Sequence, residues 1–412
     1  MPDDDAATQV KPLPARHPDA PRSVPPGVAI FARAVGVRGP SDDEFRRIGE
    51  ALHEGDPLMD GLVAWMAGVG IKETRPLFEE ALEYGIANVP DAPEPLREFF
   101  AVVEDTPDWV DSEKLRIAAQ TMNTGGADGL YIARDVALVG GYTYAGFNQT
   151  LLRTGALEKG SNKRFAETSQ WAFDLISDGG LDKHGVGYRS TLRVRFIHSL
   201  VRRHVTAMPD WDADKWGLPI NQADMAATIV GSLVAPSVGG LGMGLVSRPS
   251  EYEAIAHLTR YAGWLMGIDD EFLPRDFRES IRVLHHTSAA LANPDETSPQ
   301  LARPMATDPL GWNYSRWQPL RRRLAQSQHL SVSMFFLGGK TMTQLGLPSR
   351  TLPWYPILRT PVNLARSAAK LLPGGRERAA IRGRAQQMRF MRTMEAAPVT
   401  IGETTHLSQH AA

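Results

Sequence analysis

The stretch over residues 191–204 carries a histidine whose surroundings suit metal ligation. On a helix that turns by about 100° per residue, Val194, Ile197 and Val201 form an apolar stripe, and His198 falls inside it. We therefore expect His198 to face the core as a neutral imidazole, the form that binds iron. A buried histidine can equally be a hydrogen-bonded core residue, and the pattern leaves both interpretations open.

Two arginines flank this histidine on its own side of the predicted helix. Arg195 lies three residues before His198, and Arg202 lies four residues after it. Two guanidiniums beside an imidazole lower its pKa, because like charges disfavour its protonated form. The same guanidiniums could bind carboxylates, including the propionates of a haem.

A second group of polar residues shares one face of the preceding predicted helix. Arg164, Thr168, Trp171 and Leu175 are spaced so that a guanidinium and a hydroxyl lie among apolar groups. Such a donor pair suits O2, which becomes partly negative as it is reduced. The alternative is an ion pair between Arg164 and Glu167 on a solvated face, and the sequence does not separate the two.

Other metal-binding chemistry has less support. The chain has no cysteine, which excludes disulfides, zinc-thiolate sites, iron-sulfur clusters and cysteine nucleophiles. His406 and His410 have a spacing that would suit zinc, but they lie in a polar tail. The net charge of −2, from 45 basic and 47 acidic residues, gives no electrostatic footprint for nucleic acid.

Helices must position these side chains, because the chain shows a series of helical patterns and almost no period-two alternation. We expect an all-α fold. Ser41 and Glu44 form a capping box that opens a helix. The candidate residues lie on helices expected over 162–176 and 189–205. Further helices are expected over 96–103, from 114, and over 129–152, 222–234, 250–266, 277–291, 317–326, 361–372 and 376–394.

One domain is expected. Residues 1–27 are rich in proline and predict a disordered leader, 28–395 a single all-helical domain, and 396–412 a flexible tail. The uncharged run from Met225 to Ser247 has membrane-spanning length. Its five glycines and Pro236 favour a buried helix that breaks near residues 234–236, followed by a glycine-rich loop.

The arrangement of Arg164, Thr168 and His198 resembles that of the latex-clearing proteins, or rubber oxygenases. These are extracellular bacterial haem enzymes that cleave polyisoprene, grouped with haem oxygenases that act on smaller prenyl chains. The resemblance runs over residues 28–394 and includes two further segments, Asp105-Thr106-Pro107-Asp108-Trp109-Val110-Asp111 and Gly263-Trp264-Leu265-Met266-Gly267-Ile268.

The resemblance implies a globin-like helical core with additional N- and C-terminal helices and a b-type haem ligated by His198. Arg164 and Thr168 would lie on the oxygen side. The implied reaction uses O2 to cleave the C=C bonds of cis-1,4-polyisoprene into products with aldehyde and ketone ends. The alternatives are a related oxygenase acting on a smaller prenyl compound, a non-catalytic haem O2 carrier or sensor, and a helical membrane-surface protein without a cofactor.

The chain departs from the family pattern at two places. The resemblance predicts a glutamate base on the helix before the arginine, where this chain has Asn148. An amide cannot take a proton at neutral pH, so Glu167 serves instead, or the base is dispensable, or the substrate is not rubber. The resemblance also predicts an extracellular protein, yet the chain shows no export leader, which would fit a cytoplasmic protein if the sequence is the complete gene product.

The C-terminal segment 359–392 is strongly basic, with Glu377 as its single acidic residue. Apolar residues are interleaved with the arginines and Lys370. Such a segment can lie at an anionic lipid surface. The alternative is an ordinary helix that packs on the core by its apolar residues.

Overall fold

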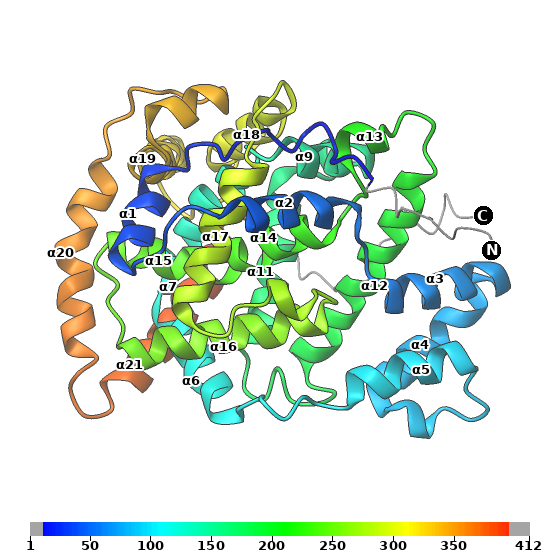
Figure 1. The fold of residues 1–412 in the computed structure, drawn as a ribbon. Helices are drawn as coiled ribbons and strands as arrows, with labels where there is room; N and C mark the ends of the chain where they lie inside the picture. The colour runs from blue at the N-terminus through cyan, green and yellow to red at the C-terminus, as the bar shows by residue number, and fades with distance from the viewer. Residues whose placement is uncertain (1–10, 395–412) are drawn as a thin grey trace.

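The computed structural model describes residues 11–394, and over this range the chain forms helices and no β-strand (Figure 1). The predicted all-α fold is confirmed. The α-helices, in chain order, are α1 Pro26–Ala34, α2 Asp42–Glu50, α3 Pro57–Val69, α4 Ile71–Tyr84, α5 Glu94–Glu104, α6 Ser112–Thr124, α7 Gly126–Ile132, α8 Val139–Gly141, α9 Ala145–Arg153, α10 Ala156–Lys159, α11 Ser161–Leu175, α12 Val186–Thr206, α13 Ala213–Trp216, α14 Gln222–Leu233, α15 Ala235–Gly242, α16 Pro249–Leu265, α17 Phe277–Leu291, α18 Thr297–Thr307, α19 Gln318–Gln344, α20 Trp354–Ala369 and α21 Gly375–Thr393.

Several helices lie where local sequence signals predicted them. Both halves of the capping box are present at the start of α2, where the Ser41 side chain accepts from the Glu44 backbone N–H and Glu44 bonds back. The two helices that carry the candidate residues, α11 and α12, lie within a few residues of their predicted bounds, and α17 matches its prediction.

The prediction of one helix over 129–152 was wrong. The segment divides into α7, a π-helical stretch Ala133–Leu138, the short α8 and α9, with a break at residues 142–144. Its glycines were expected to permit close approach, and Gly146 does so, because a Cβ there would collide with the guanidinium of Arg16. The predicted glycine-rich loop after Val234 is also wrong, since those residues form α15.

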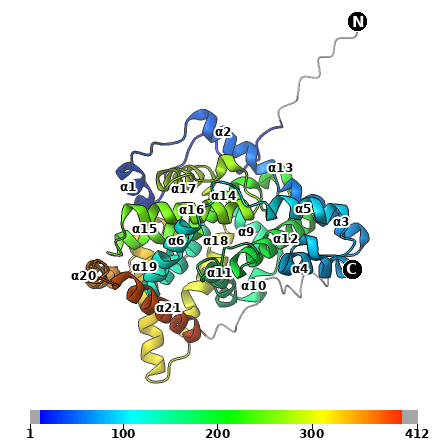
Figure 2. The same cartoon turned by 90° about the horizontal axis from the view of Figure 1, so that it is seen from below.

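Long helices form the centre of the molecule. α12 packs against α3, α11 and α16, and α14 packs against α15, α16 and α17. Helices α3, α4 and α5 form a lobe at one end of the molecule, and α20 runs along the opposite edge (Figures 1 and 2). The residues of the buried core come from almost every helix, so the described chain has one contiguous core.

The N-terminal segment lies along this core from residue 11 onward, although a disordered leader was predicted over 1–27. Arg16 is buried and forms a two-bond ion pair with Asp224 of α14, at 2.7 and 3.0 Å. Arg22 donates to the carbonyl of Ala290. Residues 1–10 and the predicted tail, with His406 and His410, lie outside the described residues.

The continuous stretch Gln222–Gly242, made of α14 and α15, is long and apolar enough to cross a membrane by length and composition. Half of its most apolar window is buried inside the molecule, which is also typical of the core helix of a folded domain. Within this structure the stretch forms a wall of the cavity described next.

Candidate functional site

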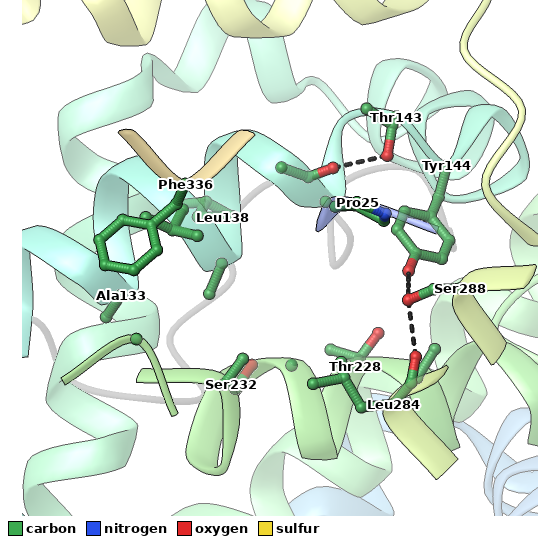
Figure 3. Close-up of a pocket in the computed structure, with 18 of the residues that line it drawn as sticks. Pro25, Ala133, Leu138, Thr143, Tyr144, Thr228, Ser232, Leu284, Ser288 and Phe336 are labelled. Atoms are coloured by element: carbon green, nitrogen blue, oxygen red, sulfur yellow. Dashed lines mark hydrogen bonds between the residues drawn. The ribbon is translucent and has the colours of Figure 1, made fainter. Parts of the chain in front are cut away.

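An apolar cavity of about 230 Å³ lies between α11, α14, α15, α17 and the segment that contains the π-helix (Figure 3). α1 and the middle of α19 close it from the outside through Val28, Phe31 and Phe336. The π-helical residues Ala133 and Leu138 face the space in Figure 3. π-Helical turns are rare and occur often at functional sites.

The hydroxyl groups in the wall are largely satisfied by the protein itself. Tyr144 and Ser288 share a hydrogen bond of 2.9 Å, and Ser288 is also 2.6 Å from the carbonyl of Leu284 (Figure 3). Thr228 donates to the carbonyl of Asp224, one turn earlier on its own helix. With these groups paired, the cavity offers mainly an apolar surface to a ligand.

The wall formed by α14 and α15 carries a signal that our sequence analysis missed. Small residues recur there at helical spacing, which lets a ligand approach the helix closely. They are Ala227, Thr228, Gly231, Ser232, Ala235 and Gly239. The periodicity was visible in the sequence, but only the fold shows that this stripe faces a cavity.

Of the seven predicted site residues, Thr168 lies in the cavity wall, together with its helical neighbours Ser169 and Trp171. Thr168 is solvent-exposed, so the cavity is open to solvent near this residue. Its hydroxyl donates to the carbonyl of Arg164 at 3.2 Å. Trp171 donates to Thr191 at 3.0 Å, which ties α11 to the helix that carries His198.

His198 is half-buried on α12, and its Nδ1 is buried without a hydrogen-bond partner among the described residues. Burial lowers the pKa of His198 to about 4; Arg202 adds to the shift and Asp56 opposes it. A neutral imidazole with an unpartnered nitrogen fits a haem-iron ligand. His285 also has an unpartnered Nδ1, whereas His257, His286 and His329 have hydrogen-bond partners.

The two arginines beside His198 are paired with carboxylates of the protein. Arg195 forms a bidentate pair with Asp56, at 2.6 and 2.7 Å, and both side chains are buried. Arg202 pairs with Asp60 and also donates to the carbonyl of Ile220. Both acids belong to the N-terminal side of α3, so these guanidiniums fix α12 against α3.

The other six predicted residues, His198 among them, lie outside the cavity wall. Glu167 pairs with Lys159 at 2.8 Å, and not with Arg164 as the alternative interpretation required. The Arg164 guanidinium lies 5.5 Å from the ring centre of Tyr142. Asn148 is fully buried and donates to the carbonyl of Tyr142 and to Thr297, while its own carbonyl oxygen has no partner among the described residues.

Comparison with protein family models shows which family this chain belongs to. The model of the family described as "ER-bound oxygenase mpaB/B'/Rubber oxygenase, catalytic domain" matches residues 130–370, more than half of the chain. The chain belongs to this family. The mpaB/rubber oxygenase family is a family of oxygenases, which are oxidoreductases, and the matched region contains Arg164, Thr168 and His198 as well as most of the cavity wall.

The chain is also similar to a rubber oxygenase and to a latex clearing protein. The chain is 25% identical over 191 residues to the rubber oxygenase of Streptomyces sp. (strain K30), and the matched part covers 44% of this chain and 45% of the relative. The structure of latex clearing protein LCP in the closed state is similar with a TM-score of 0.59 at 17% identity, over 88% of this chain and 90% of that one. The second likeness concerns the fold.

Proposed function

We propose that this protein is a haem-dependent dioxygenase that cleaves a C=C bond of an isoprenoid chain. The observation that carries the proposal is the apolar cavity with Thr168 in its wall, in a member of an oxygenase family. An apolar wall suits a hydrocarbon substrate, because several of its hydroxyl groups already bond within the protein and lose little when hydrocarbon covers them.

The residues present fit a haem through His198, which is neutral and whose Nδ1 has no partner within residues 11–394. When bound, a haem would supply the binding and activation of O2. The chain would hold the isoprenoid against the small side chains of α14 and α15 and keep bulk water from most of it. Thr168, with Arg164 one turn earlier, would supply the hydrogen-bond donors on the oxygen side.

The reaction balances without any further reductant. One trisubstituted C=C bond and one O2 give one ketone and one aldehyde, so both oxygen atoms end in the products. No proton has to leave the substrate in this balance. A dedicated carboxylate base is therefore not required by stoichiometry, which agrees with the amide Asn148 and the ion-paired Glu167.

A second candidate substrate is a short prenyl compound, which the cavity could hold whole, whereas a polymer would extend through the opening near Thr168. A cavity of 150 Å³ is known to hold benzene, so about 230 Å³ holds a segment on the order of ten carbon atoms. This corresponds to roughly two isoprene units. Cleavage assays should therefore compare polyisoprene with short prenyl chains.

The ligand assignment is tested by haem content. We expect His198→Ala to lose haem, because haem held by apolar contacts alone lacks its iron ligand. His285→Ala is the matched control, since His285 is the other histidine described here with an unpartnered Nδ1. Soret absorbance per protein should fall in the first variant and not in the second. Stoichiometric haem with an unchanged spectrum in His198→Ala would overturn the assignment.

Product analysis tests the reaction itself. With ¹⁸O2 and an isoprenoid substrate, ketone and aldehyde products, trapped at once by borohydride reduction, should each carry one labelled oxygen. Intact substrate in the presence of reduced, oxygen-binding haem would show a carrier or sensor instead. Labelled oxygen in only one of the two cleavage products would exclude the dioxygenase.

A further inference from the structure

The helix α20 is attached to the protein by its polar side. It runs along the outer edge of the molecule in Figure 1 and lies at the edge, seen nearly end-on, in Figure 2. Its inward side chains form hydrogen bonds and ion pairs with the body at 2.6–3.1 Å. They are Tyr355 and Arg359 to Asp128, Asn363 to the carbonyl of Met243, Ser367 to the carbonyl of Gly244, and Lys370 just beyond the helix to the carbonyl of Val246.

The opposite side of α20 is apolar and faces outward. At about 100° per residue, Ile357, Leu358 and Val362 share one side of the helix, and Pro361 lies among them. The large apolar side chains on this surface are 43–70% exposed; we call them the leucine face. They are Leu352, Ile357, Leu358, Val362, Leu364, Leu371 and Leu372. A helix of a folded domain normally buries its apolar side, so this helix is inverted.

The contacts of α21 differ from those of α20. α21 packs against α6 and α7, and its Phe390 is buried between Trp312, Tyr131 and His329. From the sequence we considered residues 359–392 as one segment, which would either lie at a lipid surface or pack on the core as a whole. The structure divides it, with α21 as an ordinary core-packed helix and α20 as the helix with an uncovered apolar side.

The charged residues in the segment around the leucine face are almost all basic. Between residues 345 and 394, Glu377 is the single acidic residue. Arg350 lies beside the start of the face, and Arg378 and Arg382 lie beyond its end, where Arg378 donates to the carbonyl of Pro373. All three are exposed. The ligand of this surface is therefore expected to be apolar with negative charge at its border.

Three kinds of partner could cover the leucine face: a second copy of the chain, another protein, or a lipid surface. The observations above favour the lipid surface. A second copy of the chain, docked by the same face about a two-fold axis, would bring the arginines of both copies together. A protein partner would need polar or aromatic anchors, but the polar side chains of α20 are turned inward and the leucine face is aliphatic. An anionic lipid surface needs only hydrocarbon to bury and cations at its headgroups.

We propose that the leucine face docks this protein on an anionic lipid surface. α20 rests on α19 through the Trp354–Ser327 and Tyr355–Ser331 hydrogen bonds, and on residues 243–246 after α15. α19 and α15 also wall the cavity. Docking by α20 thus sets the cavity beside a lipid phase, and the proposal does not depend on the reaction assigned to that cavity.

Vesicle co-sedimentation tests the proposal. The parent protein should bind vesicles of phosphatidylcholine with phosphatidylserine, and bind more weakly to phosphatidylcholine alone. The triple variant Leu358→Ser/Leu371→Ser/Leu372→Ser should lose at least about tenfold in partition coefficient. The reason is that these leucines, exposed in the free protein, supply the apolar area that becomes buried when the protein binds the lipid. The matched control, Val69→Ser/Tyr84→Ser/Val102→Ser, removes exposed apolar groups from the distant α3–α5 lobe and should bind like the parent.

A second variant tests how much the basic residues contribute to vesicle binding. Arg378→Glu/Arg382→Glu should weaken binding to anionic vesicles, and added salt should reduce the difference from the parent. Because the chain has no cysteine, Leu358→Cys can carry an environment-sensitive fluorophore at one position. Its emission should shift to the blue with anionic vesicles, whereas the same fluorophore at Val69→Cys should not shift.

Three results would overturn the docking surface: no binding of the parent to anionic vesicles, equal binding by the leucine triple variant, or an equal loss in the control triple variant. A parent protein that dimerises in sedimentation equilibrium and loses the dimer in the leucine variant, without vesicle binding, would assign the face to a second copy instead. All substituted leucines are exposed, so unfolding curves should match those of the parent.

Discussion

At the scale of single residues, the protonation state of His198 follows mainly from burial. The sequence suggested that two arginines would keep it neutral, but burial is the largest cause of its lowered pKa and Arg202 contributes less. Asp56, which pairs with Arg195, acts in the opposite direction. The flanking arginines are thus matched by local acids, and desolvation leaves the imidazole uncharged.

Asn148 shows why an amide occupies its position. Its NH2 group donates to the Tyr142 carbonyl, at the break between α8 and α9, and to Thr297 of α18. A carboxylate could make neither bond and would be charged at a fully buried position. In this chain the residue therefore joins two helices, and a glutamate there would require different surroundings.

Thr168 gives the sharpest single-residue test of the cavity. Thr168→Val keeps the shape and removes the hydroxyl, so haem should be retained while turnover slows by about 100-fold, the usual cost of losing one placed donor. Lys163→Ala, on the exposed side of the same helix, is the control. Steady-state rates and Soret absorbance measure the two effects. A rate equal to the parent's would remove Thr168 from the oxygen side.

At the scale of elements, the N-terminal segment is attached by a buried charge pair. Arg16 bonds to Asp224, and Asp224 also contributes to the cavity wall next to Val28 and Phe31 of α1. Binding of this segment therefore completes one side of the cavity. The composition of the segment predicted disorder, because its anchor lies 208 residues away along the chain.

Arg16→Ala should lower the free energy of unfolding by about 3 kcal/mol, because it leaves the Asp224 carboxylate buried without its cation. Arg46→Ala removes an exposed arginine from pairs with Asp43 and Glu50 and should cost less than about 1 kcal/mol. Adding Asp224→Asn to the Arg16 variant should recover part of the loss. Urea unfolding measures all three. Equal losses in the two single variants would show that the buried pair does not hold the segment.

At the scale of the whole molecule, several histidines are held neutral by burial, among them His198, His257 and His286, whose pKa values are lowered. In the unfolded chain a histidine titrates near its ordinary pKa of about 6.5. As pH falls below that value, the unfolded state takes up protons first, so stability falls. For His198 the loss runs from about pH 6.5 down to about 4 and then stops.

The contribution of His198 to this acid sensitivity is measurable. In the cofactor-free protein, the loss of unfolding free energy between about pH 7 and about pH 5 should be smaller in His198→Asn than in the parent. Urea titrations at the two pH values supply the comparison. Identical slopes in parent and His198→Asn would mean that the imidazole is not desolvated.

The sequence by itself determined the all-helical class and several of the helices, and it pointed to the family. Periodicity gave the approximate bounds of α11 and α12, and side-chain caps mark the starts of α2 and α17, because these signals act within one or two turns. The spacing of Arg164, Thr168 and His198 pointed to the family that the comparisons then showed. The apolar stripe also placed His198 on a side of α12 that the fold covers.

Tertiary structure decided what depends on distant contacts. The partners of Arg195 and Arg202 are 139 and 142 residues away, and the cavity joins segments from α1 to α19. The orientation of α20 also depends on contacts that are distant in sequence. Periodicity shows that a helix has an apolar side, but the direction of that side depends on which contacts stabilise the helix, and here Asp128 and the carbonyls of residues 243–246 bind its polar side.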